Sequence, residues 1–106
     1  MDATPHPESN SEVAKRLQAL RYHLAGHSQT AFAARYNIEV KRWNNFERGF
    51  SLSKEIALLL CQKIPGLTLD WLLRGVESGL PLQLQRDLVE AAKSITEAGS
   101  DTGARA

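Results

Sequence analysis

The chain has 106 residues, of which 42% are hydrophobic, and this length accommodates one domain with its own core but not two. The longest purely apolar run, Ile56 to Cys61, is much shorter than the roughly 20 residues of a membrane span, and the N-terminus lacks the pattern of a secretory signal. The single cysteine excludes an internal disulfide and a cysteine-rich zinc cluster, so we expect a cytoplasmic protein that does not contact membranes.

The formal net charge of +1 conceals an uneven distribution along the chain. Residues 15–48 carry seven basic and two acidic side chains, a local charge of +5, whereas residues 1–14 carry −3 and residues 49–106 carry −1. Phosphates respond to the local field and not to the total charge, so this segment suits a nucleic-acid partner. A solvated helix face without any ligand explains the same charges equally well.

Apolar residues recur at helical spacing in several blocks, and strand-like alternation never lasts, so the sequence predicts an all-α fold. The first helix is predicted from a capping box of Ser9 and Glu12 and from the apolar steps that follow, and it ends near Gly26. Ser28 can cap a short second helix, which is expected to stop at Asn37.

A third short helix is predicted from about Val40 to Arg48, and a fourth begins near Ser51. The dipeptide Pro65-Gly66 ends the fourth helix, because proline lacks the backbone donor that a helix interior needs. Thr68 then caps a short fifth helix that reaches Gly75.

A sixth, amphipathic helix is predicted over residues 82–98. Residues 11–76 are expected to form the domain, and residues 1–10 and 99–106 to be flexible. The apolar stripe of the sixth helix has no obvious partner in the five preceding helices, so it either pairs with its twin in a homodimer or folds back on its own domain. That stripe consists of Leu84, Leu88, Ala91 and Ile95.

The segment from Gln29 to Gly49 holds two helices joined by only three or four residues, so the helices must cross steeply. Ala33 is small where the backbones approach, and Asn37 tolerates the positive φ that such a turn requires. Apolar side chains supply a buried side for both helices and the turn, and the combination is typical of a helix-turn-helix. These side chains are Phe32, Tyr36, Ile38, Trp43 and Phe46.

The polar face of the third helix follows from its geometry, at about 100° per residue. If Trp43 and Phe46 are buried, two long cations and two amides point the opposite way. Such groups read base edges or bind phosphates, whereas a bland solvated face would more often mix Glu and Lys. The outward residues are Lys41, Asn44, Asn45 and Arg48.

Residues 13–74 resemble the lambda-repressor-like family of helix-turn-helix DNA-binding proteins, also called the Cro/C1 or Xre type. The resemblance implies a five-helix domain, here with an additional C-terminal helix, whose third helix enters the major groove of DNA. The matching elements are Ser28-Gln29, Phe32-Ala33, Ile38, Trp43, Phe46, Glu47-Arg48-Gly49 and the segment from Leu69 to Gly75.

The same resemblance implies roles for individual residues. An ion pair between Arg21 and Glu47 is expected to join the first and third helices. Contacts with bases are expected from Val40, Lys41, Asn44 and Asn45. Contacts with the DNA backbone are expected from Ser28, Gln29, Arg42 and Arg48.

Two functions remain open at this point. The first is a sequence-specific transcriptional regulator that binds double-stranded DNA as a homodimer. The alternative is a protein-interaction module on the same fold, such as an antitoxin or a phage-type adaptor. Glu39 favours the alternative, because it replaces the usual Ser or Thr cap and brings negative charge toward phosphates.

The sequence gives little support for an enzymatic or cofactor-dependent function. His23 and His27 lie four residues apart, but the sequence offers no third ligand for a metal. Cys61 lies in an apolar block where thiols are usually inert, and Ser51 and Ser53 are better explained as helix caps than as nucleophiles. We therefore expect no catalytic residues, no cofactor, no metal and no small-molecule ligand.

Overall fold

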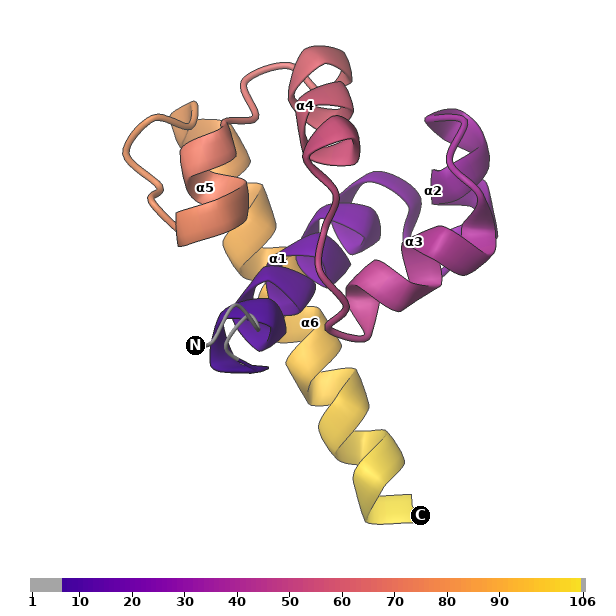
Figure 1. Ribbon diagram of the computed structural model, residues 1–106. Coiled ribbons are helices and arrows are strands. Elements are labelled where there is room, and N and C mark those ends of the chain that lie inside the picture. The colour runs from indigo at the N-terminus through magenta and orange to yellow at the C-terminus, as the bar shows by residue number, and fades with distance from the viewer. Residues whose placement is uncertain (1–6, 106) are drawn as a thin grey trace.

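The computed structural model describes the backbone of residues 7–105 and the side-chain surroundings of residues 11–96. The described chain is helical without strands, which confirms the predicted all-α class (Figure 1). Its helices are α1 (Pro7–Ala25), α2 (Gln29–Arg35), α3 (Val40–Glu47), α4 (Lys54–Lys63), α5 (Leu69–Arg74) and α6 (Leu82–Arg105). Within the described residues, no helix combines the length and apolar content that crossing a membrane requires.

Three helices begin at side-chain caps. The hydroxyl oxygens of Ser28, Ser53 and Thr68 each accept a hydrogen bond from the backbone N–H three residues on, over 2.9 to 3.1 Å. The predicted caps of α2 and α5 are thereby confirmed. Helix α4 begins slightly later than the prediction near Ser51, because Ser53 occupies the cap position.

The connection between α2 and α3 depends on Asn37. Its φ of 57° is in the left-handed region, and no other non-glycine residue among those described has a positive φ. The backbone N–H of Ile38 then donates to the carbonyl of Ala33 over 2.8 Å, which closes the turn. The prediction that Asn37 adopts this conformation is confirmed, and the physical reason is that asparagine tolerates it better than most residues.

Both terminal helices are longer than predicted. Helix α1 begins at Pro7, so Ser9 lies inside the helix and the predicted capping box is wrong. Proline suits the first helical position, because its missing N–H would be unpaired there and its φ is already helical. Helix α6 continues to Arg105, past the predicted end at residue 98, since glycine weakens a helix without removing a backbone donor. Residues 1–6 of the predicted flexible N-terminus lie outside the described residues.

One hydrophobic core connects every helix. Leu17 and Leu20 of α1 are fully buried at its centre. All the other helices contribute side chains to the same cluster, so α6 is part of the domain and not an appendage. These contributions include Phe32 from α2, Trp43 from α3, Leu60 from α4, Leu72 from α5 and Leu88 from α6.

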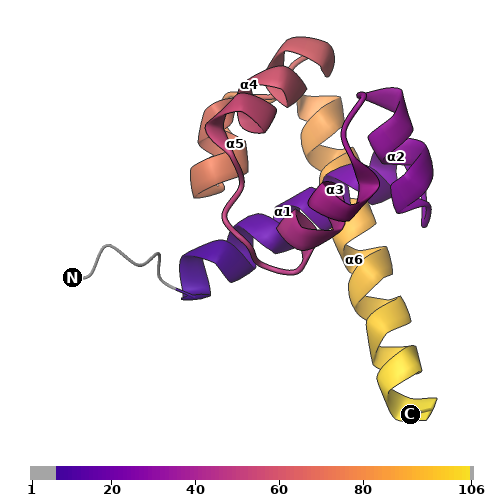
Figure 2. The ribbon, with the colours of Figure 1, turned by 45° about the vertical axis from the view of Figure 1, so that its right-hand side comes forward.

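The apolar stripe of α6 packs on its own domain through Leu84, Leu88 and Ala91. Figures 1 and 2 show α6 passing beside α1 before its C-terminal part extends away from the other helices. Leu88 and Ala91 are 3% and 5% exposed, and Leu84 is half-buried against the core. The premise that this stripe lacks a partner is therefore wrong. Ala14 and Ala19 are also buried on α1, so α1 has two packing faces where its leucine spacing indicated one.

Candidate nucleic-acid interface

Helix α3 turns its aromatic side into the core, as predicted. Trp43 is 0% exposed and Phe46 is 5% exposed. The Trp43 ring lies 4.5 Å, centroid to centroid, from the ring of Phe32 and meets the ring of Phe46 edge-on at 6.3 Å. These aromatic contacts fix the rotation of α3 against α2, and they determine which α3 side chains reach the surface.

The opposite side of α3 is polar and cationic. Asn44 and Asn45 are half-buried, and among the described residues their side-chain amides have no hydrogen-bond partner. Val40 lies at the edge of this surface with 40% of its area exposed. The predicted base-reading residues therefore share one helix surface with exposed cations. Those cations are Lys41, Arg42 and Arg48.

Two arginines of this surface lie over aromatic rings. The guanidinium carbon of Arg42 is 5.7 Å from the centre of the Phe46 ring, and that of Arg48 is 5.6 Å from the centre of the Phe50 ring. Cation–π contacts at exposed sites contribute about 0.5 to 1 kcal/mol, so they restrain both guanidinium groups at the surface. Phe50 is 55% exposed and was not singled out in the sequence, although an aromatic residue directly after Gly49 was the available signal.

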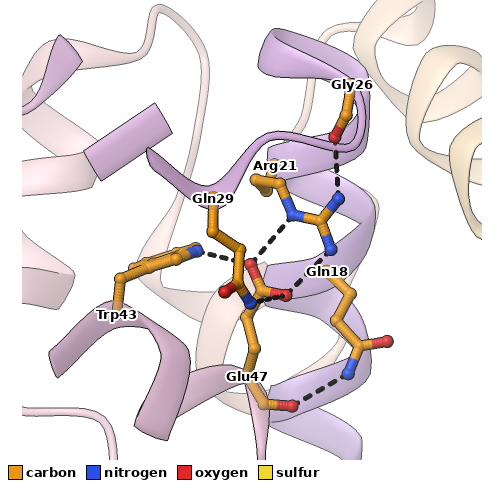
Figure 3. Close-up of polar contacts among 6 residues, drawn as sticks. All are labelled: Gln18, Arg21, Gly26, Gln29, Trp43 and Glu47. Atoms are coloured by element: carbon orange, nitrogen blue, oxygen red, sulfur yellow. Dashed lines mark hydrogen bonds and ion pairs between the residues drawn. The ribbon is translucent and has the colours of Figure 1, made fainter. Parts of the chain in front are cut away.

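A buried carboxylate lies behind this surface. Glu47 is 5% exposed, and its two oxygens accept hydrogen bonds from Nε and Nη2 of Arg21 over 3.0 and 2.9 Å (Figure 3). The indole N–H of Trp43 donates to the same carboxylate. The expected ion pair between Arg21 and Glu47 is therefore confirmed, and its two parallel hydrogen bonds give it the geometry of a strong pair.

Further hydrogen bonds attach neighbouring segments to this carboxylate and its arginine. The side chain of Gln18 donates to the backbone carbonyl of Glu47 over 2.8 Å, and Nη1 of Arg21 donates to the carbonyl of Gly26 over 2.7 Å (Figure 3). We refer to Arg21, Gln29, Trp43 and Glu47 as the Glu47 cluster. It joins α1, α2 and α3, so it fixes the orientation of the exposed α3 surface.

The two residues predicted to contact DNA at the start of α2 already have internal partners. The Ser28 hydroxyl caps α2, although the residue is exposed. The side-chain amide of Gln29 donates to Glu47 over 3.1 Å and points into the protein (Figure 3). Local sequence patterns do not indicate this contact, because Gln29 and Glu47 are separated by 18 positions along the chain.

Glu39 lies at the N-cap of α3 and forms no side-chain hydrogen bond to the helix, which confirms that it caps poorly. Its carboxylate is exposed beside the cationic surface. On the other side of that surface, Lys15 of α1 and Arg48 line a shallow depression of about 450 Å³. Lys15 was not predicted as a site residue, since nothing in its spacing connects it to α3.

The described residues offer no cluster of three metal-ligating side chains. His23 lies 3.8 Å from the carboxylate of Asp87 on α6, so its imidazole faces that helix. Burial raises the pKa of the Cys61 thiol, which favours its protonated form.

Comparisons of the chain with protein-family models, with curated proteins and with solved structures find no match.

Proposed function

We propose that α2 and α3 form a helix-turn-helix of the lambda-repressor-like type, and that the protein is a transcriptional regulator that binds specific sequences in double-stranded DNA. The observation that carries the proposal is that α3 has a buried aromatic side and an exposed polar side. One side of this 8-residue helix buries Trp43 and Phe46, and the other presents two amides and two exposed cations, with the exposed Arg48 at the C-cap. An α-helix fits the major groove, where amides and cations distinguish base pairs.

The roles follow from position and chemistry. Asn44 and Asn45 can each pair with an adenine edge through two hydrogen bonds, Lys41 can donate to guanine, and Val40 can contact a thymine methyl group. Arg42 and Arg48 lie at the edges of the helix, where phosphates pass. Ser28 and Gln29 are assigned to the DNA backbone at the start of α2, where Gln29 contributes its backbone N–H because its side-chain amide is bound to Glu47.

The rigidity of the α3 surface supports the proposal. The Glu47 cluster connects α3 to α1 and α2 through hydrogen bonds of 2.9 to 3.1 Å, besides the indole contact. A surface that reads bases must hold its donors in place before contact, since ordering them on binding reduces affinity. The cluster supplies this order without occupying any exposed α3 side chain.

A protein-interaction module is the second candidate, and one observation favours it. Val40 and Phe50 are exposed at opposite ends of α3, and the exposed carboxylate of Glu39 lies next to Val40. Exposed aromatic residues next to arginines are frequent at protein interfaces. An antitoxin or a phage-type adaptor would use this same surface against a protein.

Salt dependence separates the two candidates. Neutralising each phosphate releases counterions, so for DNA binding the logarithm of the association constant should fall with the logarithm of salt concentration with a slope of about −0.9 per contact. We expect a slope of about −3 or steeper for random duplex DNA, from fluorescence anisotropy of a labelled oligonucleotide.

Removing one cation of the α3 surface, as in Arg48→Gln, should make the slope shallower by about one, while the control Arg86→Gln on α6 should leave it unchanged. A slope near zero would contradict DNA binding and favour a protein partner.

We also propose that the protein binds DNA as a homodimer, since a single module buries only about 600 to 1,000 Å² on DNA. Leu88 and Ala91 are buried within one chain, so they are not available to a second copy while α6 stays packed on α1.

A further inference from the structure

A hollow of about 230 Å³ lies between α1, α5 and α6, and Lys15 at its edge also lines the depression beside Arg48. Its walls are mainly apolar, with the indole of Trp71 from α5, Ala19 from α1, and Leu88 and Ala92 from α6. No α2 or α3 residue lines it. Concave apolar sites with a few convergent polar groups are the usual form of small-molecule sites, and this hollow is smaller than the usual volume of about 300 to 1,000 Å³, so it suits only a small ligand.

A half-buried cation, Arg16, lines the hollow. Nε of Arg16 donates to the backbone carbonyl of Leu72 over 3.0 Å, and among the described residues this is the one hydrogen bond of its guanidinium. The guanidinium carries five N–H donors. A Cβ at Gly75 would lie 3.0 Å from Nη1 of Arg16, so glycine leaves room for the guanidinium there.

The charge around the hollow is positive. Lys15 and Arg16 line the hollow together with a single carboxylate, Glu77, and neither cation forms an ion pair with it. Lys15 pairs with Glu12 over 3.7 Å, so Arg16 is the lining cation without an ion pair among the described residues. Burial lowers the pKa of Arg16 from its ordinary value, and the Glu12 carboxylate, four residues earlier on α1, opposes that change. A desolvated guanidinium binds an incoming anion more strongly than one in water.

From the guanidinium, the apolar walls and the volume, we infer that this hollow binds a small organic monocarboxylate with an apolar body. The carboxylate pairs with the guanidinium of Arg16, and the apolar body lies against Trp71 and the small residues of α1 and α6. Because the walls come from α1, α5 and α6, such a ligand also stabilises the docking of α6. This site is independent of the proposed DNA surface, and either can exist without the other.

The test uses the full chain and benzoate as the probe, followed by ¹H–¹⁵N correlation spectra of the two tryptophan indoles. Benzoate should shift the Trp71 signal in a saturable way and leave the Trp43 signal in place, since Trp43 does not line the hollow. Benzamide has the same shape without the charge, and inorganic phosphate has charge without the apolar body. Both should bind at least about tenfold more weakly than benzoate.

Two variants test the assigned contacts. Arg16→Gln should raise the Kd for benzoate about tenfold or more, whereas Arg86→Gln, an exposed cation of α6 outside the hollow, should not change it. Because Arg16 also contacts Leu72, Ala92→Phe provides a second variant that fills the hollow from an exposed position and keeps the guanidinium. Benzoate binding that equals benzamide or phosphate binding, or that persists in both variants, would overturn the inference.

Discussion

Glu47 shows most clearly how one residue fixes the arrangement of three helices. It lies at the end of α3 and is 5% exposed. Its carboxylate oxygens accept hydrogen bonds from Arg21 of α1, Gln29 of α2 and Trp43 of α3. A carboxylate buried in this way contributes orientation more than net stability, because its desolvation offsets much of its attraction to Arg21. Removing one member of the pair is costly, since the other is left charged and unpaired.

We predict that Glu47→Gln lowers the free energy of unfolding by about 3 to 5 kcal/mol, the usual cost of breaking a buried pair from one side. Urea unfolding measures this change. The matched control is Glu12→Gln, which breaks the exposed pair with Lys15 at 3.7 Å and should cost no more than about 1 kcal/mol. Equal effects of the two substitutions would show that the Glu47 cluster does not hold the helices together.

Trp43 combines a packing role with a polar one. Trp43→Ala should cost about 3 to 5 kcal/mol and unfold much of the protein at room temperature, because the indole is fully buried against Phe32 and Phe46. Trp43→Phe keeps most of the packing and removes the donor to Glu47, so it should cost less than the alanine variant. Thermal unfolding followed by circular dichroism ranks the three proteins. An unchanged melting temperature for Trp43→Ala would contradict the orientation of α3.

The exposed residues of α3 separate into two kinds by their effect on specificity. Asn45→Ala should reduce affinity for a preferred DNA site by about 1 to 3 kcal/mol and relax the preference at one base pair. Arg48→Ala should weaken preferred and random DNA alike, because phosphates are the same in every sequence. Anisotropy titrations with a panel of single-base variants distinguish these outcomes. Equal losses on all sequences for both variants would remove Asn45 as a base reader.

At the scale of the elements, local signals in the sequence predicted most of the helices. The cap residues Ser28 and Thr68 predicted the starts of α2 and α5. The spacing of Trp43 and Phe46 predicted the buried side of α3. These predictions succeeded because caps and periodicity depend on residues within a few positions of each other.

Contacts between distant segments were not predictable in the same way. Ala14 and Ala19 give α1 a second packing face. Alanine is common on both exposed and buried helix positions, so its presence in the sequence did not predict this face. The packing of α6 on α1 could therefore be established only from the structure. The hydrogen bond between Gln29 and Glu47 is a similar case, since it depends on how α2 meets α3.

The packing of α6 on α1 predicts a sharp difference between two adjacent residues. Leu88→Ala should cost about 2 to 5 kcal/mol, since Leu88 is 3% exposed within the core. Val89→Ala, one position on and 44% exposed, should cost less than about 1 kcal/mol. Urea unfolding of both variants measures the difference. Similar small losses for the two would mean that α6 does not pack on α1 in solution.

At the scale of the whole molecule, a net charge of +1 conceals a basic segment between two acidic ones. The structure places three exposed cations of that segment on α3 or at its C-cap, whereas Lys15 and Arg16 lie on α1 and Arg35 lies on α2. The field at the α3 surface is therefore weaker than the sequence count implies. We expect moderate affinity for random DNA, with specificity supplied by the amides.

The proposed homodimer is tested by sedimentation equilibrium of the full chain, free and with DNA. We expect two chains on each DNA duplex that contains a preferred site, because two half-sites compensate for the small contact area of one module. A single chain per duplex at high micromolar concentration would contradict the homodimer and leave the DNA-binding proposal in place.

Selection of bound sites from a pool of random duplex DNA tests the central claim most directly. The account predicts that repeated selection enriches one sequence motif, and that Asn45→Ala changes the enriched base at one position of that motif. A pool that stays random after selection with the folded protein would contradict sequence-specific recognition of DNA by α3.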